Sequence, residues 1–442
     1  MALSGLDIYK LLPKTNCKEC GFPTCLAFAM QLAKKAVSVE KCPYVSLQAK
    51  ATLDAASQPP VKQVSLGFGD AKFDIGNETV MFRHEEKFRN PCGVGFIIED
   101  SLSDAEIKSR LAKINLLNFE RVGQKLDVNL VAIKQAKDPA RFVQAVKLTA
   151  ANTKLAVALM SEDPQALKQA LDLVKDRKPL IYGADSSNFA EMGKLAKEFN
   201  AALAIKAKDL EDGANITQEL AKLGVFDLVI ETQAKNISGK IWDLTQARRL
   251  ALKKSVRSLG FPALVKVEKD DPYEEALEAA TYILKYASLV LIKGLETWQV
   301  LALLTLRQNI YTDPQKPLQI EPKVYPIGAV GKNSPVLVTT NFSLSYYTVL
   351  SEVEASKIGA HIMSVDTEGM SVLTAWAAEK FTAGKITETL NKFNLSDIVA
   401  HKKLIIPGYV AMMSGDLADE SGWQIIVGPK EAAGIPSFLK NL

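Results

Sequence analysis

Short apolar runs alternate with helix-like stretches through the middle of the chain. The eight runs lie at 94–98, 128–133, 155–160, 179–182, 202–207, 228–231, 262–267 and 287–292. Runs that are apolar throughout are typical of strands buried on both faces of a parallel sheet. Eight such strands alternating with helices over this length predict a (β/α)8 (TIM) barrel. Two half-sheets of a doubly wound fold are the alternative.

The stretches between these runs open with helix-start signals. Ser103 and Glu106 have the spacing of a capping box. Asp138, Asp163 and Asp271 each stand directly before a proline. A side-chain oxygen ahead of the first helical residue accepts unpaired amide hydrogens, and proline suits the first turn. We therefore predict helices that begin at these four points.

The alternation resumes on a smaller scale toward the C-terminus. The predicted strands are 336–339, 361–365, 403–406 and 423–427. The residues at their carboxyl ends are small or hydroxylated: Thr340, Gly369 with Ser371, Gly408 and Gly428. Ligands of open α/β sheets bind beyond these ends, and such residues leave room for a large flat ligand, although they are also ordinary turn residues. No G-x-G-x-x-G follows the first strand, which disfavours a dinucleotide.

These patterns predict an α/β protein of several domains. We expect an N-terminal module at 1–50, a linker at 51–62, a hairpin plus barrel at 63–310 and an open, Rossmann-like α/β domain at 325–442. The linker is inferred from its Ala/Ser/Gln/Pro-rich composition. In residues 63–90, loose alternation predicts two strands that meet at a Gly76-Asn77 turn.

Composition and charge narrow the classes of function. The 442 residues are 48% hydrophobic and 24% charged, as in folded globular proteins. No apolar stretch is long enough for a membrane span, and the start lacks a secretory layout, so we expect a cytoplasmic protein without a membrane partner. Residues 1–62 hold 8 Lys+Arg and 4 Asp+Glu, which leaves 46 of each in the rest. No basic face indicates nucleic-acid binding.

The positively charged segment also holds four of the five cysteines: Cys17, Cys20, Cys25 and Cys42. Their spacing is C-x2-C-x4-C-x16-C. Without an export signal we expect thiols rather than disulfides, and such a cluster indicates a metal. The x4 gap and the Cys-Pro ending favour ferredoxin-type ligation of one [4Fe-4S] cluster. Structural zinc is the alternative, and the absence of any metal is a third hypothesis.

Other residues with chemical potential are fewer. Thr24 is placed to cap a helix over 25–37, with Cys25 in its first turn. Cys92 begins an apolar run and is predicted to be a core residue, and His84 is predicted to lie at the surface. The barrel's strand ends carry scattered acids and no histidine, so a scaffold or docking role is favoured over a reaction of the barrel's own.

Taken together, the four cysteines, the linker, the eight-repeat middle and the glycine-rimmed tail resemble the large subunit of the corrinoid/iron–sulfur protein, from end to end. The resemblance implies one N-terminal [4Fe-4S] cluster, a central barrel and a C-terminal corrinoid-binding domain. It implies a heterodimer with a barrel-shaped small subunit, and a methyl carrier rather than a free-standing enzyme. The other implied partners are a methyltetrahydrofolate methyltransferase that loads cobalt, the CO dehydrogenase/acetyl-CoA synthase that takes the methyl group, and a low-potential electron donor.

One feature of the sequence bears on the ligation of cobalt. Many corrinoid domains supply a histidine from a D-x-H-x-x-G motif, but the comparable strand end, 366–369, has none. His361 and His401 stand at the opening ends of their strands. We therefore predict a base-off corrinoid without a protein histidine ligand. Omitting a strong axial donor makes Co(I), the methyl acceptor, easier to reach, and the cluster is expected to reduce Co(II) back to Co(I).

Strand-end position and the family match together predict the corrinoid contacts. The predicted residues are Thr340, Tyr346, Gly369, Met370, Ser371, Val372, Leu373, Thr374, Gly408, Gly434, Ile435 and Pro436. The amides at 369–374 are placed to bind polar atoms of the corrinoid tail, and Thr374 to reach the cobalt face through water.

Two other classes of function compete with a methyl carrier. In the first, the barrel binds a pterin and transfers the methyl group itself, and the metal cluster is structural. The scattered acids at the strand ends give this hypothesis weak support. In the second, the chain is a zinc-stapled adaptor with no redox role.

Overall fold

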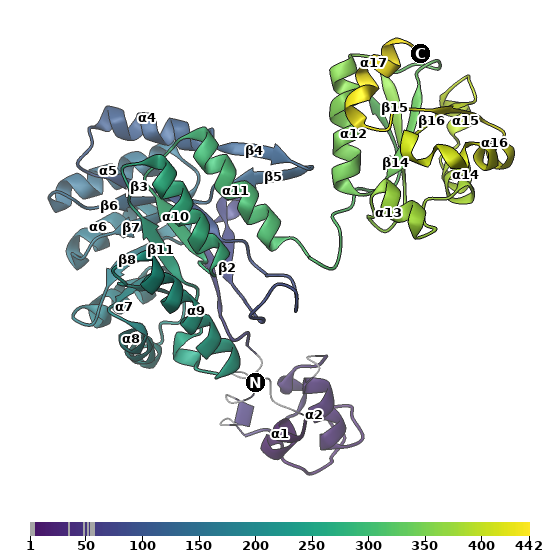
Figure 1. Cartoon of the computed structure of the whole chain (residues 1–442). Helices are drawn as coiled ribbons and strands as arrows, with labels where there is room; N and C mark the ends of the chain where they lie inside the picture. The colour runs from purple at the N-terminus through teal and green to yellow at the C-terminus, as the bar shows by residue number, and fades with distance from the viewer. Residues whose placement is uncertain (1–4, 34–35, 47–48, 51–52, 54–57) are drawn as a thin grey trace. The chain divides into compact units, whose positions relative to one another are not determined.

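The computed structural model describes residues 5–33, 36–46, 49–50, 53 and 58–442 (Figure 1). The chain divides into two compact units. The first holds the N-terminal segment and the barrel, and the second, mainly residues 312–442, holds the C-terminal sheet. Of the predicted linker, residues 51–52 and 54–57 lie outside the described residues. No helix in the described part of the chain combines the length and apolar character needed to cross a membrane.

Eight parallel strands form the barrel, as the pattern of apolar runs predicts. They are β3 (Gly93–Glu99), β6 (Leu130–Lys134), β7 (Ala156–Met160), β8 (Leu180–Ala184), β9 (Ala202–Ala207), β10 (Leu228–Thr232), β11 (Leu264–Val267) and β12 (Leu289–Ile292). In the sheet they follow the order β10-β9-β8-β7-β6-β3-β12-β11. A bridge between Ile230 and Ala263 links the two ends, so the barrel is nearly closed. The doubly wound alternative is wrong.

Eight helices follow the eight strands and surround the barrel (Figure 1). They are α4 (Asp104–Asn115), α5 (Pro139–Asn152), α6 (Pro164–Val174), α7 (Phe189–Glu198), α8 (Leu210–Lys222), α9 (Ile237–Lys253), α10 (Pro272–Leu284) and α11 (Thr297–Tyr311), with short 3-10 turns η3 (Lys175–Arg177) and η4 (Arg257–Leu259). The predicted capping box at Ser103 and Glu106 is confirmed. The N-caps at Asp138, Asp163 and Asp271, each followed by proline, are confirmed as well.

Alternate residues of each barrel strand face opposite sides. Alanines such as Ala132, Ala158 and Ala204 line the interior beside Leu130 and Leu180, because the axis of an eight-stranded barrel leaves little space. The intervening residues pack outward against the helices. Cys92 lies in that outer layer, fully buried, as predicted, and burial raises the pKa of its thiol to about 12.

A hairpin closes the N-terminal end of the barrel. Strands β1 (Gln63–Leu66) and β2 (Phe73–Gly76) pair antiparallel around the short turn η2 (Gly69–Ala71). Val64, Leu66 and Ile75 join the interior cluster of the barrel. The predicted Gly76-Asn77 turn is wrong: the loop is 67–72, and Gly76 (φ 79°) ends β2 where the Lys62 carbonyl leaves no room for a side chain.

The sequence pattern did not predict a second hairpin, β4 (Asn118–Arg121) and β5 (Gln124–Asp127), which lies between α4 and β6. Its two-residue turn places Val122 and Gly123 at φ 53° and 67°. Left-handed conformation at both central residues identifies the type I′ turn that matches strand twist.

The C-terminal unit is an open five-stranded sheet in the order β13-β15-β14-β16-β17. Its strands are β13 (Val324–Ile327), β14 (Val336–Thr340), β15 (Ala360–Val365), β16 (Lys403–Ile406) and β17 (Gln424–Val427). Its helices and short turns are α12 (Ser343–Ser356), α13 (Val372–Ala377), α14 (Ala383–Lys392), α15 (Leu395–Ile398), η5 (Gly408–Met413), α16 (Ser414–Ser421), η6 (Ala432–Gly434) and α17 (Ile435–Lys440). Four strands are parallel as predicted, and the antiparallel edge strand β13 is additional.

Helices cover both faces of this sheet. Leu337, Ile362 and Ile405 pack toward α12 and α17, whereas Val338 and Met363 pack toward α13, α14 and α16. Figure 1 shows α12 on one side of the sheet and α14 with α16 on the other. The predicted open α/β class is confirmed.

The N-terminal segment contains α1 (Gly5–Leu11), α2 (Cys25–Ala33) and the turn η1 (Val39–Lys41). Thr24 Oγ1 accepts from the amide of Ala27, so the predicted cap is confirmed. The helix ends at Ala33, and residues 34–35 lie outside the described part.

A buried ion pair fastens the segment after β2 to the barrel. Arg248 donates to Glu78 at 2.9 Å, both side chains are less than a tenth exposed, and the guanidinium lies over the rings of Phe88 and Tyr286 at 4.6 Å each. Burial raises the pKa of Glu78 even with the arginine beside it.

We predict that Arg248→Ala lowers the free energy of unfolding by about 3–5 kcal/mol, because it leaves a buried carboxylate unpaired. The matched control is Lys253→Ala on the same helix, which breaks an exposed pair with Glu85 and should cost less than about 1 kcal/mol. Urea unfolding of the full chain measures both, and equal losses would contradict the assignment.

Candidate functional site

The order of the C-terminal strands creates a crevice at the carboxyl ends of the neighbouring strands β14 and β16. From β14 the chain passes through α12 to β15 on one side, and later places β16 on the other side. Strands β14 and β16 pair at a single register position, Leu337 with Ile405. Open α/β sheets bind their ligands at such a point, where the connections that follow two neighbouring strands run in opposite directions.

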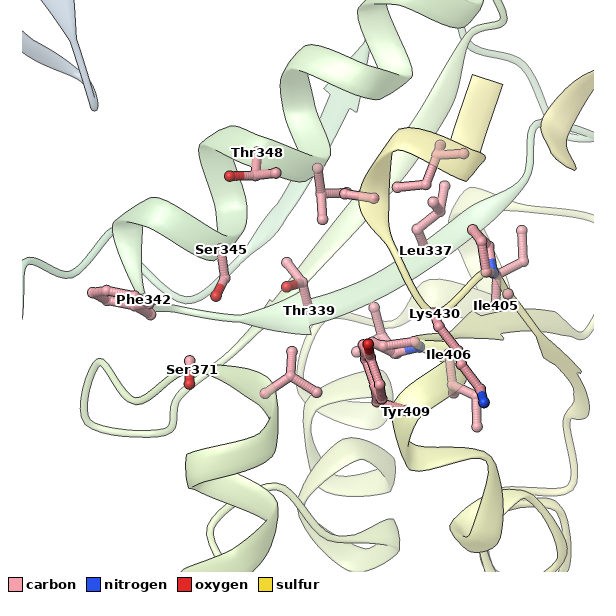
Figure 2. A pocket seen from close by; sticks show the side chains of 18 of the residues that line it. Leu337, Thr339, Phe342, Ser345, Thr348, Ser371, Ile405, Ile406, Tyr409 and Lys430 are labelled. Atoms are coloured by element: carbon pink, nitrogen blue, oxygen red, sulfur yellow. The ribbon is translucent and has the colours of Figure 1, made fainter. Parts of the chain in front are cut away.

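A cavity of ≈ 350 Å³ occupies this crevice (Figure 2). Leu337, Thr339, Ile405 and Ile406 contribute from the strands, Phe342, Ser345 and Thr348 from the start of α12, and Ser371, Val372, Tyr409, Lys430 and Ile435 from the loops and helix starts beyond the sheet. The lining is mainly aliphatic and aromatic, with a few hydroxyls. Such a cavity accepts a flat apolar group that offers one or two hydrogen-bonding atoms.

The hydroxyl of Thr339 is the most distinctive polar group of the cavity. The residue is 1% exposed, and its Oγ1 has no hydrogen-bond partner among the described residues. Because strand residues alternate between faces, Thr339 lies on the same face as Leu337, toward α12. A buried hydroxyl without a partner costs free energy, and a ligand atom in the cavity would satisfy it. The residues present therefore fit a bound ligand with a polar atom at this depth.

Asn341 holds together the loops that border the crevice. Its Oδ1 accepts from the amides of Thr367 (2.9 Å) and Gly369 (3.0 Å), and its Nδ2 donates to Gln319 and Asp366 at 3.2 Å each. The loop it binds contains Gly369 at φ 76°, a conformation that glycine adopts readily. The sequence argument did not select Asn341. Asn341 could have been found from the sequence because it stands directly after a predicted strand, as does the Asp-Thr-Glu-Gly loop that it binds.

The residues predicted to contact a corrinoid fall into three groups. Ser371, Val372 and Ile435 line the cavity. The second group lies on or near the rim of the cavity. Gly369 and Met370 belong to the loop held by Asn341, and Leu373 and Thr374 lie on the exposed side of α13. Gly408 lies against residues 428–430, and Gly434 and Pro436 stand beside Ile435. Thr340 and Tyr346 do not line the cavity: Thr340 is fully buried on the opposite face, and Tyr346 packs against Tyr325 and Tyr347.

The two histidines of the C-terminal unit lie at the opening ends of their strands, away from the crevice. His401 Nε2 bonds to the carbonyl of Ser334 at 3.0 Å, and its Nδ1 accepts from the amide of Lys403, at the opening end of β16. His361, 5% exposed, opens β15 opposite Val336, and its Nδ1 has no partner among the described residues. His84 is exposed and stacks on Phe82, as predicted.

The four predicted cluster ligands lie in the N-terminal segment at different depths. Cys25 and Cys42 are buried in its apolar cluster, with Cys20 packed against it, and Cys17 is exposed. Asn16 fastens the first turn of α2. Its side-chain Oδ1 accepts a hydrogen bond from the backbone amide of Cys25, and its backbone N–H donates to the Cys25 sulfur at 3.4 Å.

Tyr44 follows Cys42 by two residues and donates a hydrogen bond to Glu19 at 2.8 Å. This hydrogen bond raises the pKa of Tyr44. Within the described residues, no three His, Cys, Asp or Glu side chains converge as a metal site. The ligand set stays a prediction that the donor chemistry, four thiols on one loop-rich segment, fits.

Ion pairs occupy the C-terminal mouth of the barrel, where barrel enzymes carry their active sites. Lys134 bonds to Glu99 at 3.1 Å and to Glu268 at 2.8 Å, and Lys206 pairs with Glu162. Burial disfavours the charge of Lys134, but its two carboxylate hydrogen bonds together outweigh burial and raise the pKa of its ammonium.

The deeper polar groups of the mouth are paired as well. Tyr182 donates to the buried carboxylate of Glu231, and Lys266 lies 3.8 Å from the same carboxylate. Burial and the charge of Glu231 raise the pKa of Tyr182. Lys240 donates to the carbonyl of Thr232. These groups satisfy one another and leave few strand-end acids free for catalysis.

Comparison with known proteins identifies the family. A family model described as CO dehydrogenase/acetyl-CoA synthase delta subunit matches residues 63–439. The corrinoid/iron-sulfur protein large subunit of Moorella thermoacetica is 48% identical over 441 residues, which cover 100% of this chain and 99% of the relative. The chain belongs to the corrinoid/iron–sulfur protein large-subunit family.

Other relatives extend this family to archaea. The acetyl-CoA decarbonylase/synthase complex subunit gamma of Methanothermobacter thermautotrophicus is 34% identical over 456 residues, with 100% of this chain and 99% of that protein covered. A second family model, for an Fe-S cluster, matches residues 12–44, which include all four predicted ligands. The delta-subunit match begins after this segment, whereas the relatives match along their full length.

Among solved structures, Yersinia pestis DHPS with a pterine-sulfa conjugate is 11% identical and covers 50% of this chain and 94% of its own, at a TM-score of 0.38. No argument rests on this likeness.

We predict that the C-terminal unit loses stability as the pH falls below about 6.5. Burial, and then the charge of His401, lowers the pKa of His361 from its ordinary 6.5. The unfolded chain therefore takes up this proton at a higher pH than the folded chain, so the stability linked to His361 is complete above about pH 6.5 and falls toward the folded-state pKa.

Calorimetric scans between about pH 5.5 and 7.5 measure this dependence. His361→Gln should flatten it, and the exposed-site control His84→Gln should leave it unchanged. An unaltered slope in the His361 variant would refute the assignment.

Proposed function

We propose that the chain is the large subunit of a methyl-carrying corrinoid/iron–sulfur protein in acetyl-CoA metabolism. It would carry a methyl group from methyltetrahydrofolate, by way of a methyltransferase, to CO dehydrogenase/acetyl-CoA synthase. The observation that carries this proposal is an apolar, histidine-free crevice at the switch point of the C-terminal sheet, in a chain whose N-terminal segment matches an Fe-S family model. The names of the full-length relatives support it.

The C-terminal crevice is the proposed corrinoid site. The orphaned hydroxyl of Thr339 and the aliphatic walls fit the polar and apolar parts of a flat ligand arm. Asn341 fixes the loop that begins α13, which presents Ser371 to Thr374 at the rim. When bound, the corrinoid supplies a nucleophilic metal centre. The protein would bind and orient it, and the C-terminal unit offers no imidazole at the crevice because His361 and His401 lie at the opposite ends of their strands.

The N-terminal segment is the proposed site of one [4Fe-4S] cluster, held by Cys17, Cys20, Cys25 and Cys42. The cluster would supply the electron that restores the corrinoid after oxidation, and a low-potential donor would recharge it. The segment's excess of lysines partly offsets the negative charge of four thiolates. The proposed permanent partner is the small subunit.

The rival function, a barrel methyltransferase that binds a pterin, is less well supported. A pterin requires free carboxylates or amides at the barrel mouth, and here Glu99, Glu162 and Glu231 are engaged by Lys134, Lys206 and Tyr182. Tetrahydrofolate binding by the full chain without its methyltransferase would favour this rival.

We predict that the chain, purified without oxygen together with the small subunit, contains about four Fe, as in a single cubane, and a single cobalt. The Co(II) EPR spectrum should show no nitrogen superhyperfine splitting. Zinc without iron would remove the electron-transfer role, and splitting by an imidazole nitrogen would overturn the ligation.

We predict that Cys20→Ala removes the iron–sulfur absorption and abolishes reductive reactivation, while methyl transfer by a chemically pre-reduced sample continues. The matched control is Cys92→Ala, which should keep its iron because this thiol is buried in the barrel wall. Loss of both activities in the Cys20 variant would indicate a structural cluster.

A further inference from the structure

Three exposed lysines of the N-terminal segment have no acidic partner among the described residues: Lys14, Lys18 and Lys41. We call them the lysine group. Residues 1–50 hold seven lysines, no arginine and three acids. Each acid already has a partner: Asp7 with Lys10 and Glu40 with Lys50, both at 3.2 Å, and Glu19 with the hydroxyl of Tyr44. Glu19 keeps its charge, so in the described part of the segment the group sets three cations against one carboxylate without a cationic partner.

The lysine group flanks two of the predicted cluster ligands. Lys18 directly follows Cys17, and Lys14 precedes it by three residues. Lys41 directly precedes Cys42. The hydrogen bond from the hydroxyl of Tyr44 to Glu19, at 2.8 Å, ties the stretch after Cys42 to the stretch after Cys17. The cations without acidic partners therefore lie on the two neighbouring stretches that carry these ligands.

The loop that presents Lys14 and Lys18 is fixed at several points. All of residues 14–18 are exposed, yet Asn16 is bound to Cys25 through both its side chain and its backbone N–H. The carbonyl of Lys18 accepts from the amide of Gly21 at 2.9 Å. The ammonium of Lys14 lies 5.6 Å from the centre of the Tyr9 ring. A partner would therefore meet a preformed loop and would not have to order it on binding.

The exposure of the thiols indicates where an electron would enter. Cys17 is exposed, whereas Cys25 and Cys42 are buried. A cluster held by these residues would thus be nearest to solvent on the side of Cys17, beside the lysine group.

The type of cation indicates the class of partner. Arginine, the residue suited to bidentate binding of phosphate, is absent from residues 1–50. Lysine offers a hydrated point charge, which suits a contact that forms and dissociates quickly. Nucleic-acid binding depends on many phosphate contacts, and three cations supply few. Carboxylates on the surface of an acidic protein match this arrangement better.

We propose that the lysine group is the docking surface for the electron donor, a small acidic one-electron carrier protein, an inference that rests on the proposed [4Fe-4S] cluster. One electron passes from the reduced carrier to the cluster, so the carrier is oxidised and the cluster reduced, and no bond forms or breaks. Opposite charges raise the rate of encounter. Electron-transfer complexes bury little surface, so a short loop with a few charges is sufficient.

The test measures association of an acidic bacterial ferredoxin with the full chain, purified without oxygen together with the small subunit, between about 0.01 and 1 M salt. Lys14→Gln combined with Lys18→Gln should lower the association rate constant roughly 10-fold at low salt and flatten its salt dependence. Adding Lys41→Gln should lower it further. The matched control, Lys10→Gln combined with Lys50→Gln, removes the same charge from lysines that already have acidic partners. It should change the rate constant less than about twofold, as expected for exposed pairs.

Several outcomes would overturn the docking surface. Equal decreases in the two double variants would show that only the net charge of the segment matters. A changed cluster potential with unchanged ferredoxin binding would assign the lysines to offsetting the charge of the cluster. Slower reactivation with unchanged ferredoxin binding would assign them to a contact within the chain.

Iron content separates failure of this inference from failure of the proposed function. All variants should keep the iron–sulfur absorption, because the replaced side chains are exposed. An unmodified chain that holds iron but does not bind ferredoxin would overturn the docking surface while the proposed function stands. An unmodified chain without iron would count against the proposed function itself.

Discussion

Ion pairs dominate the C-terminal mouth of the barrel. The C-terminal ends of parallel barrel strands bring polar residues together in one mouth. Lys134, Glu99 and Glu162 stay partly exposed there, whereas Glu231 is buried, and a buried charge is costly unless it finds a partner. Here the partners are other residues of the same mouth: Lys134 bridges Glu99 and Glu268, and Glu231 accepts from Tyr182. A mouth neutralised in this way is stable, but it has little left to offer a substrate. The pairing gives these strand-end groups a structural role within the barrel.

The C-terminal sheet shows the opposite situation. Its strand order opens a crevice, and the hydroxyl of Thr339 is buried there without a partner. The neighbouring loop is nevertheless well fastened, because Asn341 uses its carbonyl oxygen for two amides of 367–369 and its amide for Gln319 and Asp366. A rigid rim around an unsatisfied interior is the arrangement expected when part of the structure is completed by a ligand.

Sequence reasoning was most successful where the cause of an element is local. Barrel strands are apolar throughout because both faces are buried, so all eight could be found, and Asp-Pro pairs marked the helix starts. The β4–β5 hairpin was missed because its strands are rich in Asn, Glu, Gln and Lys and its turn uses Val122, which rarely adopts a left-handed conformation. Strand β13 was missed because Pro326 stands within it, and proline is tolerated only at a sheet edge. The role of Asn341 depends on tertiary packing, which local pattern does not encode.

If a corrinoid binds in the crevice as proposed, the residues around it offer no other nitrogen ligand in place of a histidine. A side-chain nitrogen can coordinate a metal only through a free lone pair, which neither an amide NH2 nor an ammonium group has. Among the described residues that line or border the crevice, the nearest candidates are Asn341 and Lys430. Asn341 Nδ2 donates two hydrogen bonds, and Lys430 presents an ammonium group at the cavity wall (Figure 2). Glu368 lies at φ 57° in a loop that the amides of Thr367 and Gly369 hold to Asn341, and its carboxylate pairs with Lys380. The lack of a nitrogen donor is therefore a property of the whole lining of the crevice, in keeping with the base-off corrinoid proposed above.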